Sequence, residues 1–323
     1  MLRIVAEQGF TRIMGIAFIF PGQGTQAAGM GRQLAEQFPE AARMLDRIDE
    51  ILGFRLSRIC FEGPAERLTD SVISGLAVFA VSAATLEVVR GFVQPVAFAG
   101  YSVGQYAAIY AAGALSLEDA VQLLRARGQC MERAARENPS TMLSVVGLPA
   151  AKAAEIAERL RDVYVSNYNG PGHVSFACST KSAPTLEKLI EEHGVLQIER
   201  LRVAGGWHSP FMLPAVECLR EALAGVSFAA WSGIVGDNVT GALFSGPQDL
   251  PESLLAHLYS PVRWIEVVRT LKGSGIRRFI EIGFSNQLTK FVRFIDRKAE
   301  ALSTATIGDI ELLKRLCAEH GSP

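Results

Sequence analysis

The chain has 323 residues, of which 49% are apolar, and its formal net charge is −1. A charge this close to zero gives no sign of a nucleic-acid or anionic-membrane partner, and the length fits two domains or one large α/β domain with an insertion. The five cysteines are scattered without metal-ligand spacing, so we expect no metal site and reduced thiols in a cytoplasmic protein. We expect no membrane span, because no apolar stretch reaches the length that one needs.

The N-terminal part alternates apolar runs with helical patterns. Residues 1–15 are predicted to be an extension without a secretory signal, with translation starting at Met1 or Met14. Residues 16–20 predict a buried strand that ends in the glycine-rich turn Pro21-Gly-Gln-Gly24. Apolar residues at helical spacing predict a helix over 30–52, and 78–89 predict a second, buried helix.

The most informative stretch is Gly100-Tyr101-Ser102-Val103-Gly104, which follows a predicted strand over 93–99 and precedes a helical run. The glycines allow a sharp turn between strand and helix, which exposes the serine hydroxyl near the N–H groups of the helix start. That arrangement suits a serine nucleophile that attacks an acyl carbonyl. A helix over 117–136, with Ser116 and Asp119 as its capping residues, is predicted next.

The pattern changes at about residue 141. Strands over 142–148, 163–166, 174–178 and 196–203, with helices over 150–160 and 183–193, give the β-α-β-β-α-β order of a ferredoxin-like unit. We therefore predict an α/β fold with a hydrolase-like large subdomain (16–140 and 206–300) around a parallel sheet, a ferredoxin-like small subdomain (141–205) inserted in it, and a C-terminal tail (301–323). The large subdomain resumes with a helix over 211–224, a strand over 278–283 and a helix over 285–297.

A serine nucleophile needs a base, and His208 is the best placed of the five histidines. It lies where the chain returns from the predicted insertion to the large subdomain, whereas His193 and His320 are expected to be solvated. An α/β-hydrolase would also need an acid between the serine and a histidine near the C-terminus. Nothing marks such an acid, which argues against a standard esterase.

These segments resemble the malonyl-CoA:acyl carrier protein transacylases and the acyltransferase domains of polyketide synthases. The likeness runs in order from about residue 16 to 298, and any one segment alone is weak. The segments that carry it are Phe20-Pro-Gly-Gln-Gly-Thr-Gln26, Gly100-Tyr-Ser-Val-Gly104, Arg127-Gly128 and Trp207-His-Ser-Pro210, with weaker matches at Asn167-Tyr-Asn-Gly-Pro-Gly172, Tyr259-Ser-Pro-Val-Arg-Trp264 and Glu281-Ile-Gly283.

The resemblance implies roles for individual residues. Ser102 would be the nucleophile and His208 the base, and a backbone carbonyl near His257 would orient the histidine in place of a carboxylate. The backbone N–H groups of Gln23 and Val103 would bind the oxyanion.

The resemblance also implies an acyl pocket. Arg127 would clamp the free carboxylate of a malonyl-type group, with Tyr101 and Trp207 as further substrate-binding residues. Departures from the family pattern leave the native acyl group open. The family usually has His at Tyr101, Glu at Gln105 and Pro at Phe284. At Gly206-Trp207, malonyl-selective members commonly carry Ala-Phe, and methylmalonyl-selective members a smaller Ser.

The implied function is transfer of a malonyl-type group from coenzyme A to the phosphopantetheine thiol of an acyl carrier protein in fatty acid or polyketide biosynthesis. The thioester is a substrate, and no permanently bound cofactor is expected. Open alternatives are a hydrolase that clears stalled acyl carriers, a malonyl transferase serving a malonate decarboxylase carrier subunit, and a noncatalytic carrier-binding module. The nine positive and three negative residues over 263–298 suggest either a docking surface for an acidic carrier or a solvated helical face.

Overall fold

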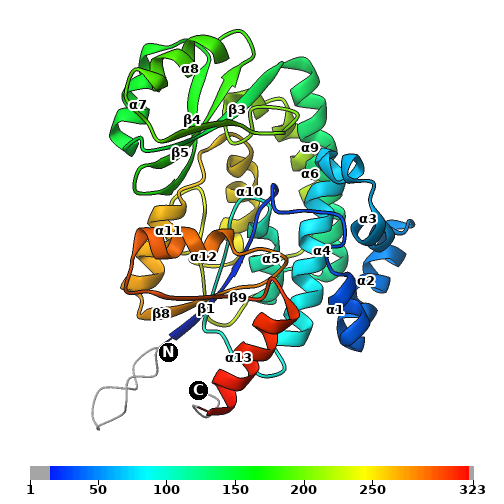
Figure 1. Cartoon of the computed structure of the whole chain (residues 1–323). Coiled ribbons are helices and arrows are strands. Elements are labelled where there is room, and N and C mark those ends of the chain that lie inside the picture. The colour runs from blue at the N-terminus through cyan, green and yellow to red at the C-terminus, as the bar shows by residue number, and fades with distance from the viewer. Residues whose placement is uncertain (1–14, 320–323) are drawn as a thin grey trace.

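The computed structural model describes residues 15–319, which form a large unit built around one sheet and a small unit built around another (Figure 1). All strand pairs in the large unit are parallel, in the order β7-β2-β1-β8-β9. Its strands are β1 (Gly15–Phe20), β2 (Ala97–Gly100), β7 (Ile234–Val235), β8 (Ile276–Glu281) and β9 (Glu300–Ser303).

The small unit is an antiparallel sheet with the order β4-β5-β3-β6, which is the ferredoxin-like order. Its elements are β3 (Ser140–Val146), α7 (Ala150–Arg159), β4 (Val163–Gly170), β5 (His173–Ser179), α8 (Ala183–Glu191) and β6 (Gln197–Arg200). The predicted fold class, a parallel-sheet α/β unit with an inserted ferredoxin-like unit, is confirmed.

The remaining helices belong to the large unit. They are α1 (Arg32–Gln37), α2 (Pro39–Leu52), α3 (Leu56–Glu62), α4 (Ser71–Val89), α5 (Gly104–Ala111), α6 (Leu117–Glu137), α9 (Ala215–Leu223), α10 (Leu250–Tyr259), α11 (Trp264–Gly273), α12 (Gln287–Ile295) and α13 (Ile307–Glu319). Short 3-10 turns lie at Ala65–Thr69, Pro210–Met212 and Pro247–Asp249.

Side-chain alternation along β1 explains why helices cover both faces of the parallel sheet. Phe18 and Phe20 belong to one core cluster, which includes residues of α4, α5 and α6. Ala17 and Ile19 point the other way into a second cluster, which includes residues of α11 and α12. A strand buried on both faces reads as a continuous apolar run, and residues 16–20 do so.

Helix α4 is longer than predicted because it begins at Ser71, where the Asp70 carboxylate accepts hydrogen bonds from the N–H groups of Val72 and Ile73. At this length it is apolar and long enough to cross a membrane, contrary to our expectation of no such stretch. However, 83% of its apolar window is buried inside the molecule, where α4 packs against α2 and α6. Its composition therefore fits a central core helix.

Two other predictions need correction. The helix predicted over 30–52 is broken at Phe38, whose backbone is extended because Pro39 follows and disfavours a helical conformation there. The predicted tail 301–323 is wrong over its described part, since β9 pairs with β8 and α13 packs against β9. The predicted extension 1–15, apart from Gly15 in β1, and the choice between Met1 and Met14 lie outside the described residues, as does His320.

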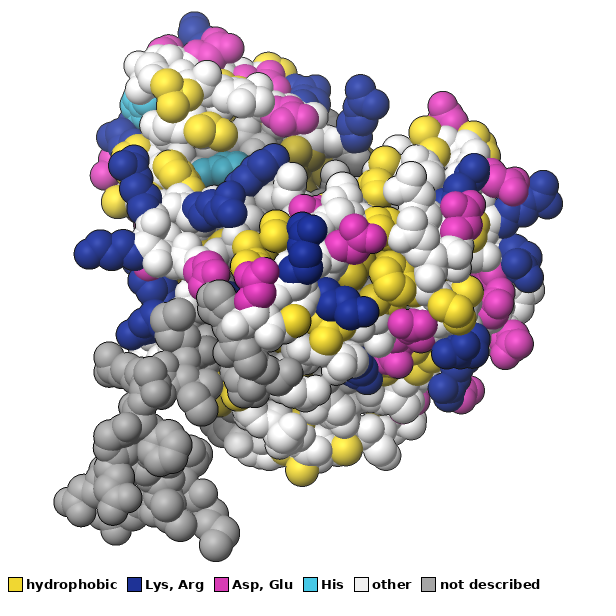
Figure 2. Space-filling view, turned by 60° about the horizontal axis from the view of Figure 1, so that its bottom comes forward, with side chains coloured by type: hydrophobic (Ala, Val, Ile, Leu, Met, Phe, Trp, Pro, Cys, Tyr) yellow, Lys and Arg dark blue, Asp and Glu magenta, His cyan; other side chains and the backbone are white. Residues whose placement is uncertain are grey.

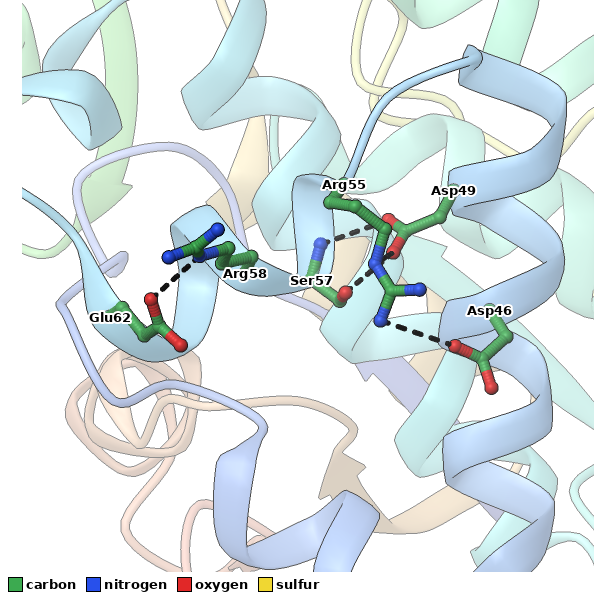
Figure 3. Close-up of polar contacts among 6 residues, drawn as sticks. All are labelled: Asp46, Asp49, Arg55, Ser57, Arg58 and Glu62. Carbon is green, nitrogen blue, oxygen red and sulfur yellow. Dashed lines mark hydrogen bonds and ion pairs between the residues drawn. The ribbon is translucent and has the colours of Figure 1, made fainter.

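A buried carboxylate fixes the junction between α2 and α3 (Figure 3). Asp49 of α2 accepts hydrogen bonds from the Ser57 N–H at 2.9 Å and the Ser57 hydroxyl at 2.5 Å, and Arg55 pairs with it at 3.2 Å. Asp49 thus satisfies an N–H group at the start of α3 that the helix itself leaves free. The Arg58–Glu62 pair on the exposed side of α3 adds little, because exposed ion pairs are weak.

The expectation of reduced thiols is wrong for two of the five cysteines. Cys130 of α6 and Cys218 of α9 form a disulfide, whereas Cys60, Cys178 and Cys317 are free and buried. The two bonded residues are 88 positions apart, so the link closes a long loop that includes the whole small unit. Such a link lowers the conformational entropy of the unfolded chain.

We therefore expect the oxidised protein to be more stable than the Cys218→Ala variant by about 3 kcal/mol in free energy of unfolding. Urea unfolding with and without dithiothreitol measures the difference. The variant is its own control, because reductant has no disulfide to break in it. Equal stability of both proteins under oxidising conditions would contradict the prediction.

Candidate active site

The turn between β2 and α5 holds Ser102 in a left-handed backbone conformation, with φ of 53°. A non-glycine residue rarely adopts this conformation, and it is typical of a nucleophile held on a strand-to-helix turn. The flanking glycines are needed because a Cβ on Gly100 would lie 1.9 Å from Gly104, and one on Gly104 would lie 2.2 Å from the Phe20 carbonyl oxygen. The turn therefore packs directly against the end of β1.

Asn238, which follows β7, fixes this turn from the neighbouring strand. Its Oδ1 accepts a hydrogen bond from the Ser102 N–H at 2.9 Å, and its Nδ2 donates to the Gly100 carbonyl at 2.6 Å and to Gln105 Oε1 at 2.8 Å. Gln105 in turn donates to the Gly236 carbonyl. The sequence prediction missed Asn238. Its one available signal is a polar residue just after a short apolar run, where a strand of a parallel sheet ends.

His208 reaches the serine from the segment that returns from the small unit. Its Nε2 lies 2.6 Å from Ser102 Oγ, and its Nδ1 lies 2.8 Å from the main-chain oxygen of His257. A carbonyl oxygen can only accept a hydrogen bond, so Nδ1 carries the proton and Nε2 offers its lone pair to the serine hydroxyl. His208, like Ser102, has a positive φ, of 56°.

Burial keeps both histidines of the site neutral. Burial first, and then the positive charge of Arg127, lowers the pKa of His208 to about 3, against a smaller opposite effect of the hydrogen bond to His257. The pKa of His257 is also lowered, by burial, His208 and Arg127 in that order. A lowered pKa means that the imidazole of His208 is unprotonated throughout the neutral range, as a proton acceptor must be.

The glycine-rich turn after β1 lies against the turn that holds Ser102. A Cβ on Gly22 would lie 2.8 Å from the Tyr101 carbonyl oxygen. The Gln23 side chain anchors this turn to α4 by donating to the Ser71 carbonyl and the Ser74 hydroxyl. Within residues 15–319, the backbone N–H groups of Gln23 and Val103 donate no hydrogen bond, so both are available to an oxyanion.

Arg127 of α6 is buried, with 3% of its surface exposed, and its guanidinium lies over the ring of Tyr106 at 5.9 Å. In the described part of the chain it has no acidic partner, and its Nη2 makes no hydrogen bond. Burial lowers its pKa, because an unpaired charge inside a protein is costly. The guanidinium therefore favours binding of an anion.

The other two predicted substrate-binding residues are engaged in packing. The Tyr101 ring contacts Trp264 and Phe291, and its hydroxyl donates to Asn169 of the small unit at 2.6 Å. The ring of Trp207 is buried against Gly205, near α6. Tyr101 thus joins the two units, and a contact of either residue with substrate stays a prediction.

A cavity of about 680 Å³ leads to His208 from the side of the small unit. Tyr259 and Pro261 of the large unit form one wall, and residues of α7 and β4 form the other. The side chains that line it are largely apolar or aromatic, with Glu158, Arg161 and Asp162 also among them. An extended substrate with an apolar arm can therefore reach His208.

The chain is similar in sequence to known proteins. The family model described as "Acyl transferase domain" matches residues 17–312. The chain is 35% identical over 302 residues to the malonyl CoA-acyl carrier protein transacylase of Bacillus subtilis, covering 92% of this chain and 95% of the relative.

Two solved structures also resemble the chain. The acyl-carrier-protein-S-malonyltransferase from Bartonella henselae superimposes with a TM-score of 0.89 at 33% identity, covering 94% of this chain and all of the other. A malonyl-transacylase solved in complex with its type II polyketide synthase acyl-carrier protein gives a TM-score of 0.90 at 27% identity, covering 94% and 99% of the two chains.

We expect Ser102 in the Asn238→Ala variant to react with a fluorophosphonate about 10- to 100-fold more slowly than in the wild-type protein. The buried Ser102 N–H would lose its hydrogen-bond partner, and the turn would lose the side chain that supports it. The rate of covalent labelling, followed by intact mass, measures this effect. Val239→Ala, at the adjacent position, is the matched control and should keep the wild-type rate. An unchanged rate in Asn238→Ala would show that the turn holds its shape without the amide.

Proposed function

The chain belongs to the acyl transferase domain family, and on that basis we propose that it moves a malonyl-type acyl group from coenzyme A to the phosphopantetheine thiol of an acyl carrier protein through an acyl-serine intermediate. The observation that carries the proposal is the hydrogen-bonded series from Ser102 Oγ through His208 to the His257 carbonyl, with the buried Arg127 charge acting on the same histidine. The resemblance implies that the pathway is fatty acid or polyketide biosynthesis.

In the first half-reaction, His208 Nε2 accepts the hydroxyl proton as Ser102 Oγ bonds to the thioester carbonyl carbon. The Gln23 and Val103 N–H groups hold the resulting oxyanion, and each such donor is worth about 3 kcal/mol of transition-state stabilisation in comparable enzymes. The carbon–sulfur bond then breaks, and the leaving coenzyme A sulfur takes the proton from His208.

In the second half-reaction the carrier thiol gives its proton to His208 and attacks the acyl-serine ester. The same oxyanion donors serve again, and breaking the ester bond returns the proton to Ser102. The main-chain carbonyl of His257 holds the required tautomer throughout, so the reaction needs no carboxylate to orient the histidine.

Arg127 supports a carboxylated acyl group as the substrate. A planar guanidinium binds a carboxylate through two parallel hydrogen bonds, which an acyl group without a carboxylate cannot offer. Uncharged acyl groups would leave the buried charge unpaired, so we expect them to load poorly.

A basic surface beside α12 supports an acidic carrier as the acceptor. Its residues are Arg269, Lys290, Arg293, Arg297 and Lys298, all exposed and, in residues 15–319, without an acidic partner within 4 Å. Figure 2 shows Lys and Arg side chains gathered on the flank where α11 and α12 lie in Figure 1. Arg263 connects this surface to the cavity, because its guanidinium lies over Tyr168, which lines the cavity.

Incubation with malonyl-CoA should add one malonyl mass to the wild-type protein and none to Ser102→Ala, because the serine oxygen is the attachment atom. Intact-mass analysis measures the adduct, and later addition of holo-carrier should remove it as malonyl-carrier. An adduct that persists in Ser102→Ala would refute the nucleophile. Release of free malonate faster than malonyl-carrier would instead indicate a hydrolase.

Reversing the charge of the basic surface in the double variant Lys290→Glu/Arg297→Glu should raise the KM for carrier about fivefold, because an acidic partner is then repelled. The KM for malonyl-CoA should stay unchanged. Steady-state transfer at low salt measures both constants, and Lys314→Glu on α13 is the control for added negative charge. If the double variant and the wild-type protein had equal KM values for carrier, the carrier would not dock on this basic surface.

A further inference from the structure

Three buried side chains near the Ser102–His208 pair lack hydrogen-bond partners. They are Arg127 through Nη2, Tyr106 through its hydroxyl, and His257 through both ring nitrogens, judged over the residues that the structure describes. Arg127 is 3% exposed, His257 1% and Tyr106 0%. Water does not reach them freely, and buried polar groups without partners are rare in folded proteins.

These groups belong to one neighbourhood. The His257 ring lies 4.8 Å from the His208 ring, and the Arg127 guanidinium lies over the Tyr106 ring. Burial is the main reason that the pKa of both histidines is lowered, and the charge of Arg127 adds to it, so the two histidines and Arg127 share one electrostatic environment. The mechanism above uses only the main-chain oxygen of His257 and leaves its imidazole without a role.

A carboxylate has more acceptor positions than one guanidinium fills. Its two oxygens offer about four lone-pair sites, of which a bidentate arginine takes two. A neutral imidazole carries one N–H donor. His257 is neutral, because burial and two neighbouring groups oppose its protonation. It can therefore donate to a carboxylate without adding a second positive charge beside Arg127.

We infer that the His257 imidazole is a specificity-determining residue, which donates a hydrogen bond to the free carboxylate of the acyl group that Arg127 holds. The inference rests on the proposed function and extends it. One residue then has two separate tasks, since its main chain orients the base and its side chain recognises the substrate.

The two tasks can be separated, because a substitution at position 257 keeps the carbonyl. His257→Leu removes the donor, whereas His257→Gln keeps an N–H donor of similar reach. The initial rate of acyl-enzyme formation is measured by quenched-flow intact mass with malonyl-CoA and acetyl-CoA. We expect the malonyl-to-acetyl ratio of kcat/KM to fall about 10- to 100-fold in His257→Leu. In His257→Gln this ratio should return most of the way to its wild-type value.

An equal loss of kcat/KM for malonyl-CoA and acetyl-CoA in His257→Leu would overturn the inference, because it would indicate only a structural or base-orienting role. An unchanged ratio would also overturn it. Arg127→Ala, run in parallel, separates this result from failure of the proposed function. If wild-type Ser102 is acylated and Arg127→Ala loses malonyl selectivity while His257→Leu does not, only the role of His257 fails.

A second measurement needs no variant. In ¹⁵N-histidine-labelled wild-type protein, forming the malonyl-enzyme should shift the His257 ring signals, and forming the acetyl-enzyme should leave them near their free positions. This test keeps the inference falsifiable if His257→Leu does not fold. Identical shifts in the two acyl-enzymes would overturn it.

Discussion

The 2.6 Å contact between Ser102 Oγ and His208 Nε2 is the constraint on which the rest of the structure depends. Both residues have positive φ values, so neither conformation is favourable by itself. Packing holds each one, through the close approach of Gly104 to β1 on one side and the hydrogen bond to the His257 carbonyl on the other. The local strain at the nucleophile is thus supported by parallel strands that are buried on both faces.

Burial and charge together keep His208 neutral and place a positive group near it. Arg127 is buried and has no acidic partner among residues 15–319. Burial first, and then the charge of Arg127, lowers the pKa of His208, and burial, His208 and Arg127 lower that of His257. An acyl carboxylate that pairs with Arg127 would remove that repulsion at the moment when His208 must accept a proton. On the proposed function, one guanidinium would therefore couple substrate recognition to the proton affinity of His208, and the carboxylate would have a kinetic effect beyond binding.

Local sequence patterns predicted much of this arrangement. The features that they did not predict depend on contacts between segments far apart in the sequence. The strand, glycine-rich turns and helix around Ser102 follow from adjacent residues. The position of His208 at the end of the predicted insertion marked it as the base, and the family resemblance supplied the His257 carbonyl. Asn238 was missed because it lies 136 positions from Ser102, and its role depends on β7 lying beside β2. The Cys130–Cys218 bond was missed for the same reason, since spacing along the chain does not reveal two helices that pack together. The same limit applies to β9, because its pairing with β8 cannot be read from the local sequence.

The disulfide bears on the site through the helices that it joins. Arg127 stands one turn before Cys130 on α6, and Cys218 lies on α9, the first long helix after His208. The helix that carries Arg127 and the segment that follows His208 are therefore linked within the large unit. All elements of the small unit lie between these two cysteines in the sequence, so the disulfide joins the two segments of the large unit that flank it. Tyr101, next to Ser102, donates a hydrogen bond to Asn169 and so ties the Ser102 turn to the small unit. The disulfide and the Tyr101–Asn169 hydrogen bond thus both help to keep Arg127, Ser102 and His208 in one fixed arrangement.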